Sequence, residues 1–255
     1  MQQIRLFLIA VQFFTRIPIP GWVGFQPEWL SQASRWFPAV GTVVGALSAL
    51  VFVGAAAWLP VKVAVLLAMA GGIVITGSFH EDGLADSADA LGGHAPKAQA
   101  LTIMKDSRIG TYGAVALLMA VLLRAETLAL FTTETIGLLL IAGHTVSRGW
   151  SVLPIAFMTY VRDDDSARAK PIADSIDGAG RVISLITVLA VLAAVGAIAP
   201  SMIGALLAGT LAGGVIALWW FRVLRRRLGG YTGDTLGATQ QLSETAFYLG
   251  VLAAL

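Results

Sequence analysis

Long apolar segments separated by short polar ones make up most of the chain. A helix needs about 20 apolar residues to cross a hydrocarbon core about 30 Å thick. Segments close to that length are predicted at residues 36–59, 63–79, 111–131, 136–160, 182–199 and 202–221, and the last twenty or so residues offer a seventh. The pattern therefore predicts an all-α, polytopic membrane bundle of six to seven transmembrane helices, folded as a single domain over residues 1–255.

The N-terminus, MQQIRLFLIAVQFFTRIPIP, has a shorter apolar run that ends at Arg16 and two prolines. It has no small-residue cleavage site, so it does not read as a signal peptide. About 11 apolar-rich residues cannot span the hydrocarbon core, and we expect a short interfacial helix here instead.

Composition agrees with a membrane protein. Of 255 residues, 57% are hydrophobic, an apolar fraction that soluble domains do not sustain. There is no cysteine, which excludes disulfides, thiolate metal sites and a cysteine nucleophile. The net charge of only +2 gives no support for nucleic-acid binding.

Basic residues are distributed unevenly between the two sets of loops. With the N-terminus in the cytoplasm, Lys62 is the basic residue of the outer loops and nearly all others face inward. The run Arg225–Arg227 is interpreted as a topology signal and a contact for anionic lipid headgroups. This orientation places the acidic stretch 76–113, the loop 161–181 and the segment GGYTGDTLGA on one cytoplasmic side.

The stretch TGSFHEDGLADSADALGGHAPKAQALTIMKDSRIGTYG, residues 76–113, carries the strongest chemical signal. Asp82, Asp86 and Asp89 fall at i, i+4 and i+7, so on a helix they share one face. Carboxylates that close repel one another unless a cation lies between them. Hard oxygen ligands without cysteine favour Mg²⁺, with Mn²⁺ as a substitute. The alternative is a solvated acidic helix start.

Other residues around the acidic stretch suit phosphate chemistry. Asp106 adds a carboxylate, and Lys105 and Arg108 beside it are suited to a diphosphate. Near the C-terminus, Asp234 and Thr235 lie among glycines that permit close backbone approach. This second segment is equally typical of a plain turn between helices.

Ionisable residues within the predicted spans should face the bundle interior, because burying an unpaired charge costs roughly 3 kcal/mol or more. Arg124, Glu126 and Arg148 are such residues, and His144 shares a face with Arg148. Two interpretations stay open: an Arg–Glu pair between the third and fourth spans, at 111–131 and 136–160, or Arg148 reaching a phosphate at the cytoplasmic end. The run 163–165 is interpreted as part of a solvated loop.

Several blocks resemble the adenosylcobinamide-GDP ribazoletransferase (cobalamin synthase) family. They are FFTRIPIP, WFPAVGTVVGAL, FHEDGLADSADALGG, MKDSRIGTYGA, SRGW and LGGYTGDTLGA, which together cover nearly the whole chain. The resemblance implies an enzyme of a bacterial cytoplasmic (inner) membrane with its active site, in a segment at about 80–112, facing the cytoplasm. In the implied reaction, α-ribazole or its 5′-phosphate attacks adenosylcobinamide-GDP and GMP leaves.

The resemblance also implies residue roles. Asp82, Asp86 and Asp89 would hold Mg²⁺, and Asp106 would complete the site or accept the hydroxyl proton. The expected substrate contacts are Lys105, Arg108, Arg148, Asp234 and Thr235, with His80 orienting a carboxylate. Glu81 departs from the family pattern and is left out of the site. Whether the chain forms a homo-oligomer stays open.

Two other classes of membrane protein share some of these features. The acidic block also resembles, more loosely, the paired-aspartate motif of CDP-alcohol phosphotransferases, but HEDGLADSADALGG lacks that family's arginine and its fourth aspartate at the expected spacing. A cation-coupled transporter should show internal repeats or broken spans near the midplane. Here the acidic cluster lies in a loop at one membrane face.

Overall fold

The computed structural model describes residues 1–24, 26–161, 173 and 175–255, and within them the chain forms helices and no β-strand. The predicted all-α fold is confirmed. The run 163–165 lies outside the described residues. In chain order the helices are α1 (Gln2–Phe14), η1 (Gly21–Val23), α2 (Pro27–Ala33), η2 (Ser34–Trp36), α3 (Phe37–Ala56), α4 (Val61–Thr76), α5 (Phe79–Gly92), α6 (Lys97–Met104), α7 (Thr111–Leu128), α8 (Thr133–Phe157), α9 (Gly178–Ile198), η3 (Pro200–Met202), α10 (Ile203–Arg227) and α11 (Gly233–Ala253).

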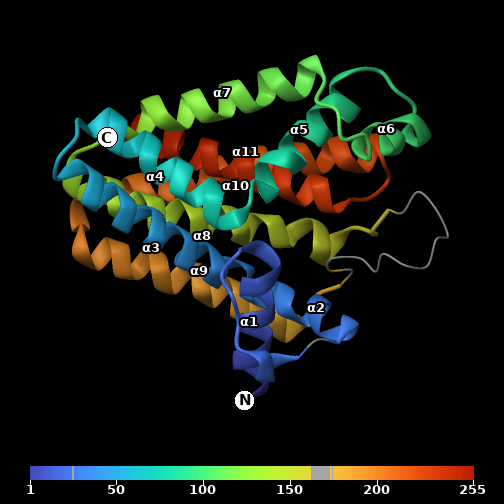
Figure 1. Ribbon diagram of the computed structural model, residues 1–255, viewed down its shortest axis with the longest axis horizontal. Helices are drawn as coiled ribbons and strands as arrows, with labels where there is room; N and C mark the ends of the chain where they lie inside the picture. The colour runs from blue at the N-terminus through green and yellow to red at the C-terminus, as the bar shows by residue number, and fades with distance from the viewer. Residues whose placement is uncertain (25, 162–172, 174) are drawn as a thin grey trace.

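The long helices α3, α4 and α7 to α11 lie along the long axis of the molecule, whereas α1 runs across it (Figure 1). Helices α5 and α6 lie at the end of the bundle opposite the C-terminus (Figure 1). The predicted acidic loop with one short helix is therefore two helices, α5 and α6, packed against each other.

Five helical segments of the described chain are long and apolar enough to cross a membrane, and the pair α4–α5 adds a sixth if it counts as one broken span. This supports the lower end of the predicted six to seven. The C-terminal helix α11 extends along the bundle, but it is not among these candidate spans. Its polar residues lower its hydropathy below that of a lipid-facing helix.

Helix α11 is instead enclosed by its neighbours. It packs against α10, α5, α8 and α7, and most of its residues are buried. The buried set includes polar side chains at Thr239, Gln240, Gln241, Ser243 and Glu244. Polar groups inside an apolar bundle must bond to one another, so α11 forms the centre of a buried hydrogen-bonded network.

A sharp turn at residues 77–78 separates α4 from α5. Gly77 and Ser78 both have positive φ, 65° and 63°, and the two helices meet at 88°. Positive φ is unusual for serine, so the surrounding contacts must hold this conformation. One such contact is the backbone N–H of Arg16, which donates to the carbonyl of Ile75 at 2.8 Å. The turn directs the acidic helix across the end of the bundle.

The expectation that Glu126 faces the bundle interior is wrong. Its exposed carboxylate accepts a hydrogen bond from Lys62 at 2.9 Å, which joins α7 to the start of α4. Arg124 does face the interior, but its carboxylate partner is Glu244 of α11 at 3.4 Å. The predicted Arg–Glu pair between the spans at 111–131 and 136–160 is therefore wrong, because Glu126 pairs with Lys62 and the buried arginine of α7 pairs with α11 instead.

Candidate active site

The acidic face of α5 meets the start of α11 where both backbones come close. A Cβ atom added at Gly83 would lie 2.6 Å from the carbonyl oxygen of Asp234, so this crossing requires glycine. Asp82 is exposed and Asp86 is half-buried on the same side of α5. Two segments far apart in sequence therefore lie side by side with their carboxylates close enough to interact.

Electrostatics show that these carboxylates interact. Burial, and then the neighbouring charges of Asp82, Asp234 and Asp89, raise the pKa of Asp86 to about 7. The pKa of Asp234 is also raised, chiefly by burial. The site therefore holds more negative charge than it can stabilise alone, which is the condition that a divalent cation relieves.

Asp89 has a different set of partners. Its two carboxylate oxygens accept hydrogen bonds from the backbone N–H groups of Gly110, at 2.7 Å, and Gly113, at 2.8 Å. Gly110 is the N-cap of α7, so Asp89 caps this helix from a neighbouring helix and complements its dipole. A Cβ at either glycine would collide with the carboxylate. Asp89 thus fixes the segment that follows α6 against α5.

Asp106 and Arg108 form an exposed pair in that segment. Arg108 donates to the Asp106 carboxylate from Nη2 at 2.6 Å and from its backbone N–H at 3.0 Å. These bonds lower the pKa of Asp106 to about 2. Lys105 is exposed beside them. Both cationic side chains are exposed to solvent, whereas Asp106 is a weak proton acceptor.

Thr235 stabilises the turn before α11. The Thr232 hydroxyl accepts from the backbone N–H of Thr235 at 3.3 Å, and the Thr235 hydroxyl accepts from the backbone N–H of Thr232 at 2.9 Å. These two bonds form a reciprocal capping box, and Thr235 is fully buried. The geometry gives Thr235 the role of holding Asp234 in place, and its side chain does not reach the site surface.

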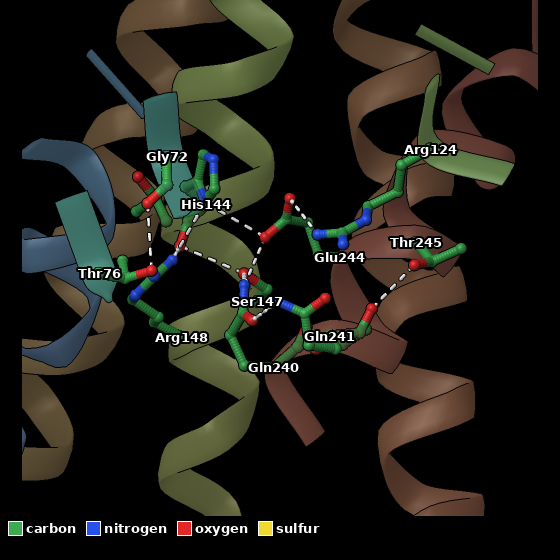
Figure 2. A network of polar contacts seen from close by, with 12 residues as sticks. Gly72, Thr76, Arg124, His144, Ser147, Arg148, Gln240, Gln241, Glu244 and Thr245 are labelled. Atoms are coloured by element: carbon green, nitrogen blue, oxygen red, sulfur yellow. Dashed lines mark hydrogen bonds and ion pairs between the residues drawn. The ribbon is translucent and has the colours of Figure 1, made fainter. Parts of the chain in front are cut away.

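A buried ionic network joins side chains of α7, α8 and α11 inside the bundle (Figure 2). The Glu244 carboxylate accepts from Arg124 at 3.4 Å, lies 3.2 Å from Nδ1 of His144, and accepts a short bond from Gln240. Gln241 then donates to Glu81 at 3.0 Å. The network joins α7, α8 and α11 to the residue immediately before Asp82.

Arg148 belongs to this network and not to the open face. It is 2% exposed and donates to the carbonyl of His144 at 3.1 Å. With His80 it lines a cavity of about 20 Å³, roughly the room that one water needs and far less than a phosphate group requires. His80 is also buried and stacks on Phe14 at 5.4 Å. Neither residue is open to a substrate here.

Arg227 holds the end of the acidic helix. Its guanidinium donates to the carbonyl oxygens of Leu91 at 3.0 Å, Gly93 at 3.0 Å and Ala95 at 3.1 Å. The carbonyl of Leu91 lies in the last turn of α5, where a cation also complements the helix dipole. The lipid-contact role expected for the whole run Arg225–Arg227 is therefore wrong for Arg227, whereas Arg225 and Arg226 are exposed.

The open face fits a magnesium ion by its donor chemistry. Asp82, Asp86 and Asp234 supply hard carboxylate oxygens, and the chain has no cysteine. Among the described residues no three metal-binding side chains are already gathered around one point. Mg²⁺ commonly binds through one or two carboxylates together with water and substrate phosphates, so such a partial set fits an ion that arrives with a diphosphate.

Sequence reasoning missed Glu244, Gln241 and Arg227. A signal was present for Glu244, because an acidic residue within a predicted membrane-spanning segment calls for a buried partner. Glu81 was set aside, yet its bond to Gln241 connects it to the site. Arg227 was indistinguishable in sequence from its two neighbours, because only its hydrogen bonds to the carbonyls at the end of α5 separate their roles.

Comparisons with known proteins agree with this architecture over almost the full chain. The profile of the cobalamin-5-phosphate synthase family matches residues 6–252. A Shewanella woodyi protein named adenosylcobinamide-GDP ribazoletransferase is 47% identical over 98% of this chain and 96% of its own length. A protein of the same name from Leptothrix cholodnii is 48% identical over 98% and 95%. No solved structure matches the chain. The resemblance found in the sequence is confirmed: the chain belongs to the cobalamin-5-phosphate synthase family of membrane transferases.

Proposed function

We propose that this chain joins α-ribazole, or its 5′-phosphate, to adenosylcobinamide-GDP with release of GMP, in the presence of Mg²⁺. Curated relatives at 47% and 48% identity carry the name of this activity, and each match covers 98% of this chain. The observation that carries the proposal is the closeness of Asp82, Asp86 and Asp234: burial, and then the charges of the neighbouring carboxylates, raise the pKa of Asp86 to about 7.

The reaction requires few chemical steps from the protein. A ribose hydroxyl oxygen forms a bond to the cobinamide-bearing phosphorus and loses its proton, while the bond from this phosphorus to the GMP oxygen breaks. Bound Mg²⁺, or Mn²⁺ in its place, supplies neutralisation of the diphosphate charge. Asp82, Asp86 and Asp234 would hold the ion.

Cationic side chains at the same end of the bundle suit the departing nucleotide. Arg108 is exposed and oriented by Asp106, and Lys105 lies next to it, so both are placed to bind phosphate oxygens. Because the pKa of Asp106 is about 2, we assign Asp106 to orienting Arg108 instead of accepting the hydroxyl proton. Asp89 holds this segment next to the acidic helix.

We further propose that the site faces the cytoplasm of a bacterial inner membrane. The end that carries α5 and α6 also holds Lys97, Lys105, Arg108, Arg181 and the basic end of α10, whereas Lys62 lies at the start of α4, at the other end. Such an asymmetry places the basic end inside.

The substrate assignment is tested with purified protein in liposomes. Adenosylcobinamide-GDP plus α-ribazole should release GMP and give the joined corrinoid when Mg²⁺ is present, and both products should disappear with excess EDTA. CDP-diacylglycerol in place of adenosylcobinamide-GDP should release no CMP. Release of CMP without corrinoid product would instead assign the chain to phospholipid synthesis.

A further inference from the structure

Helix α9 is the most loosely packed of the candidate spans. It packs on α8 and α3 and has few contacts with α10. Only 17% of its most apolar window is buried inside the bundle, against 39% for α10. A hollow on the lipid-facing side of the molecule therefore lies between α9 and the helices beside it.

This hollow is large and almost entirely apolar near the acidic end of the bundle. It has a volume of about 370 Å³ and lies among residues 146–157 of α8, residues 181–192 of α9 and Thr210 of α10. A second hollow of about 540 Å³ continues from it, sharing Leu189 and Leu192, toward Pro200 at the far end. Together they form a groove along α9.

The half of the groove beside α8 has the length of one lipid leaflet. Residues 181–192 of α9 advance about 16 Å at 1.5 Å per residue, and half of a hydrocarbon core about 30 Å thick is about 15 Å. An extended acyl chain entering at the membrane surface would therefore run along this half and end near Leu192.

An arginine side chain lies at the membrane-surface end of this half of the groove. Arg181 lies in the first turns of α9, is exposed, and its guanidinium sits 5.9 Å from the ring centre of Phe157 at the end of α8. The nearby Asp177 does not neutralise it, because the Asp177 carboxylate accepts from Arg35 at 3.2 Å and from the backbone N–H of Gly180. Arg181 forms no ion pair with another described residue.

We propose that this groove binds one phospholipid of the leaflet on the side of the acidic helix, with an acyl chain between α8 and α9 and an anionic headgroup phosphate on Arg181. The apolar lining of the groove favours a lipid acyl chain, and Arg181 at its mouth favours a negatively charged headgroup. The site is separate from the acidic face, and the proposal does not depend on the transferase reaction.

The test is native mass spectrometry of the whole protein, released from nanodiscs that contain equal amounts of phosphatidylglycerol and phosphatidylcholine. We expect one retained phosphatidylglycerol per chain, with a preference over phosphatidylcholine of about fivefold, the value of one basic group at a membrane surface. Arg181→Gln should remove the preference for phosphatidylglycerol, while one lipid per protein is still retained because its acyl chain still fits the groove.

Two further variants separate the groove from general lipid contact. Leu189→Trp places a bulky ring where the two hollows join, and it should reduce the retained lipid of either headgroup. Leu211→Trp is the matched control, since Leu211 is 68% exposed on α10 and lines neither hollow. Equal lipid retention in both variants, or an unchanged preference in Arg181→Gln, would overturn the proposal. If the wild type instead formed a dimer without bound lipid and Leu189→Trp dissociated it, the groove would be assigned to binding a second copy of the protein.

Discussion

The carboxylate of Asp89 accepts a hydrogen bond from the backbone N–H of Gly110 at 2.7 Å, across the junction between α5 and α7. The acidic stripe of α5 is thereby divided between two tasks. Its outer part, at Asp82 and Asp86, remains open to a ligand, and its last aspartate joins the acidic helix to the segment that carries Lys105 and Arg108.

Asp89→Ala should therefore act mainly on stability. Loss of a helix cap costs about 1 kcal/mol and up to about 2, so the midpoint of thermal unfolding should fall in a detergent-based assay. Asp89→Asn should lower the unfolding midpoint less than Asp89→Ala does, because its amide oxygen still accepts one hydrogen bond. A variant with unchanged stability and greatly weakened Mg²⁺ dependence would instead show that Asp89 is a metal ligand.

Arg227→Ala should loosen the segment after α5. Its guanidinium bonds three backbone carbonyls, and leaving such acceptors unsatisfied costs about 1–3 kcal/mol. We expect faster hydrogen–deuterium exchange in residues 91–96 and reduced turnover. Arg226→Ala is the matched control: it removes the same charge from an exposed neighbour, so equal effects in both would contradict the positional role of Arg227.

The buried pair Arg124–Glu244 should show strong coupling. Glu244→Met leaves Arg124 and Arg148 with less compensating charge, and breaking a buried pair costs about 3–5 kcal/mol. The double variant Arg124→Met/Glu244→Met should be less destabilised than the sum of the single variants, as measured by a double-mutant cycle on thermal unfolding.

The exposed pair Lys62–Glu126 provides the comparison for this cycle. Its side chains are 68% and 66% exposed, and such pairs contribute only about 0–1 kcal/mol. Glu126→Gln should consequently leave the unfolding midpoint almost unchanged. A Glu126→Gln effect as large as that of Glu244→Met would mean that burial does not distinguish the two pairs.

Stability without divalent cations should depend on pH through Asp86. Its pKa in the folded protein is about 7, above the ordinary value of 3.8, so the folded form binds a proton more tightly than the unfolded form. Its contribution to stability is therefore full below about pH 4 and is lost as the pH rises through 7. Thermal unfolding in EDTA should give a higher midpoint at pH 5 than at pH 8.

Asp86→Asn should flatten this dependence, because the amide does not titrate. The comparison between the two proteins at each pH removes the contributions of all other groups. The opposite result would be a wild type that is more stable at pH 8 than at pH 5, with this difference lost in Asp86→Asn. That result would contradict the raised pKa of Asp86.

The sequence was sufficient for the helices and for the acidic face, because both follow from local patterns. Apolar length located the spans, and the i, i+4, i+7 spacing put Asp82 and Asp86 on one side of α5. The meeting of this face with Asp234 followed from charge asymmetry, which put both segments at one end of the bundle.

What the sequence could not supply depends on packing between distant segments. Whether Asp89 faces a cation or the backbone of Gly110 is decided by how α7 begins against α5. The pattern of the spans favoured a pair between the third and fourth of them, but the packing of α11 beside α7 brings Glu244 to Arg124. Arg148, an apparent phosphate ligand by its position, is enclosed by the same packing.

The central claim is that the open carboxylates of α5 carry the transferase reaction. It is tested most directly by GMP release and corrinoid product in Mg²⁺-containing proteoliposomes of the wild type, Asp82→Ala, Asp86→Ala and the exposed control Arg226→Ala, each shown to be folded by its unfolding midpoint. The account predicts no detectable turnover for the two aspartate variants and near-normal turnover for Arg226→Ala. Near-normal turnover in Asp82→Ala or Asp86→Ala would contradict it.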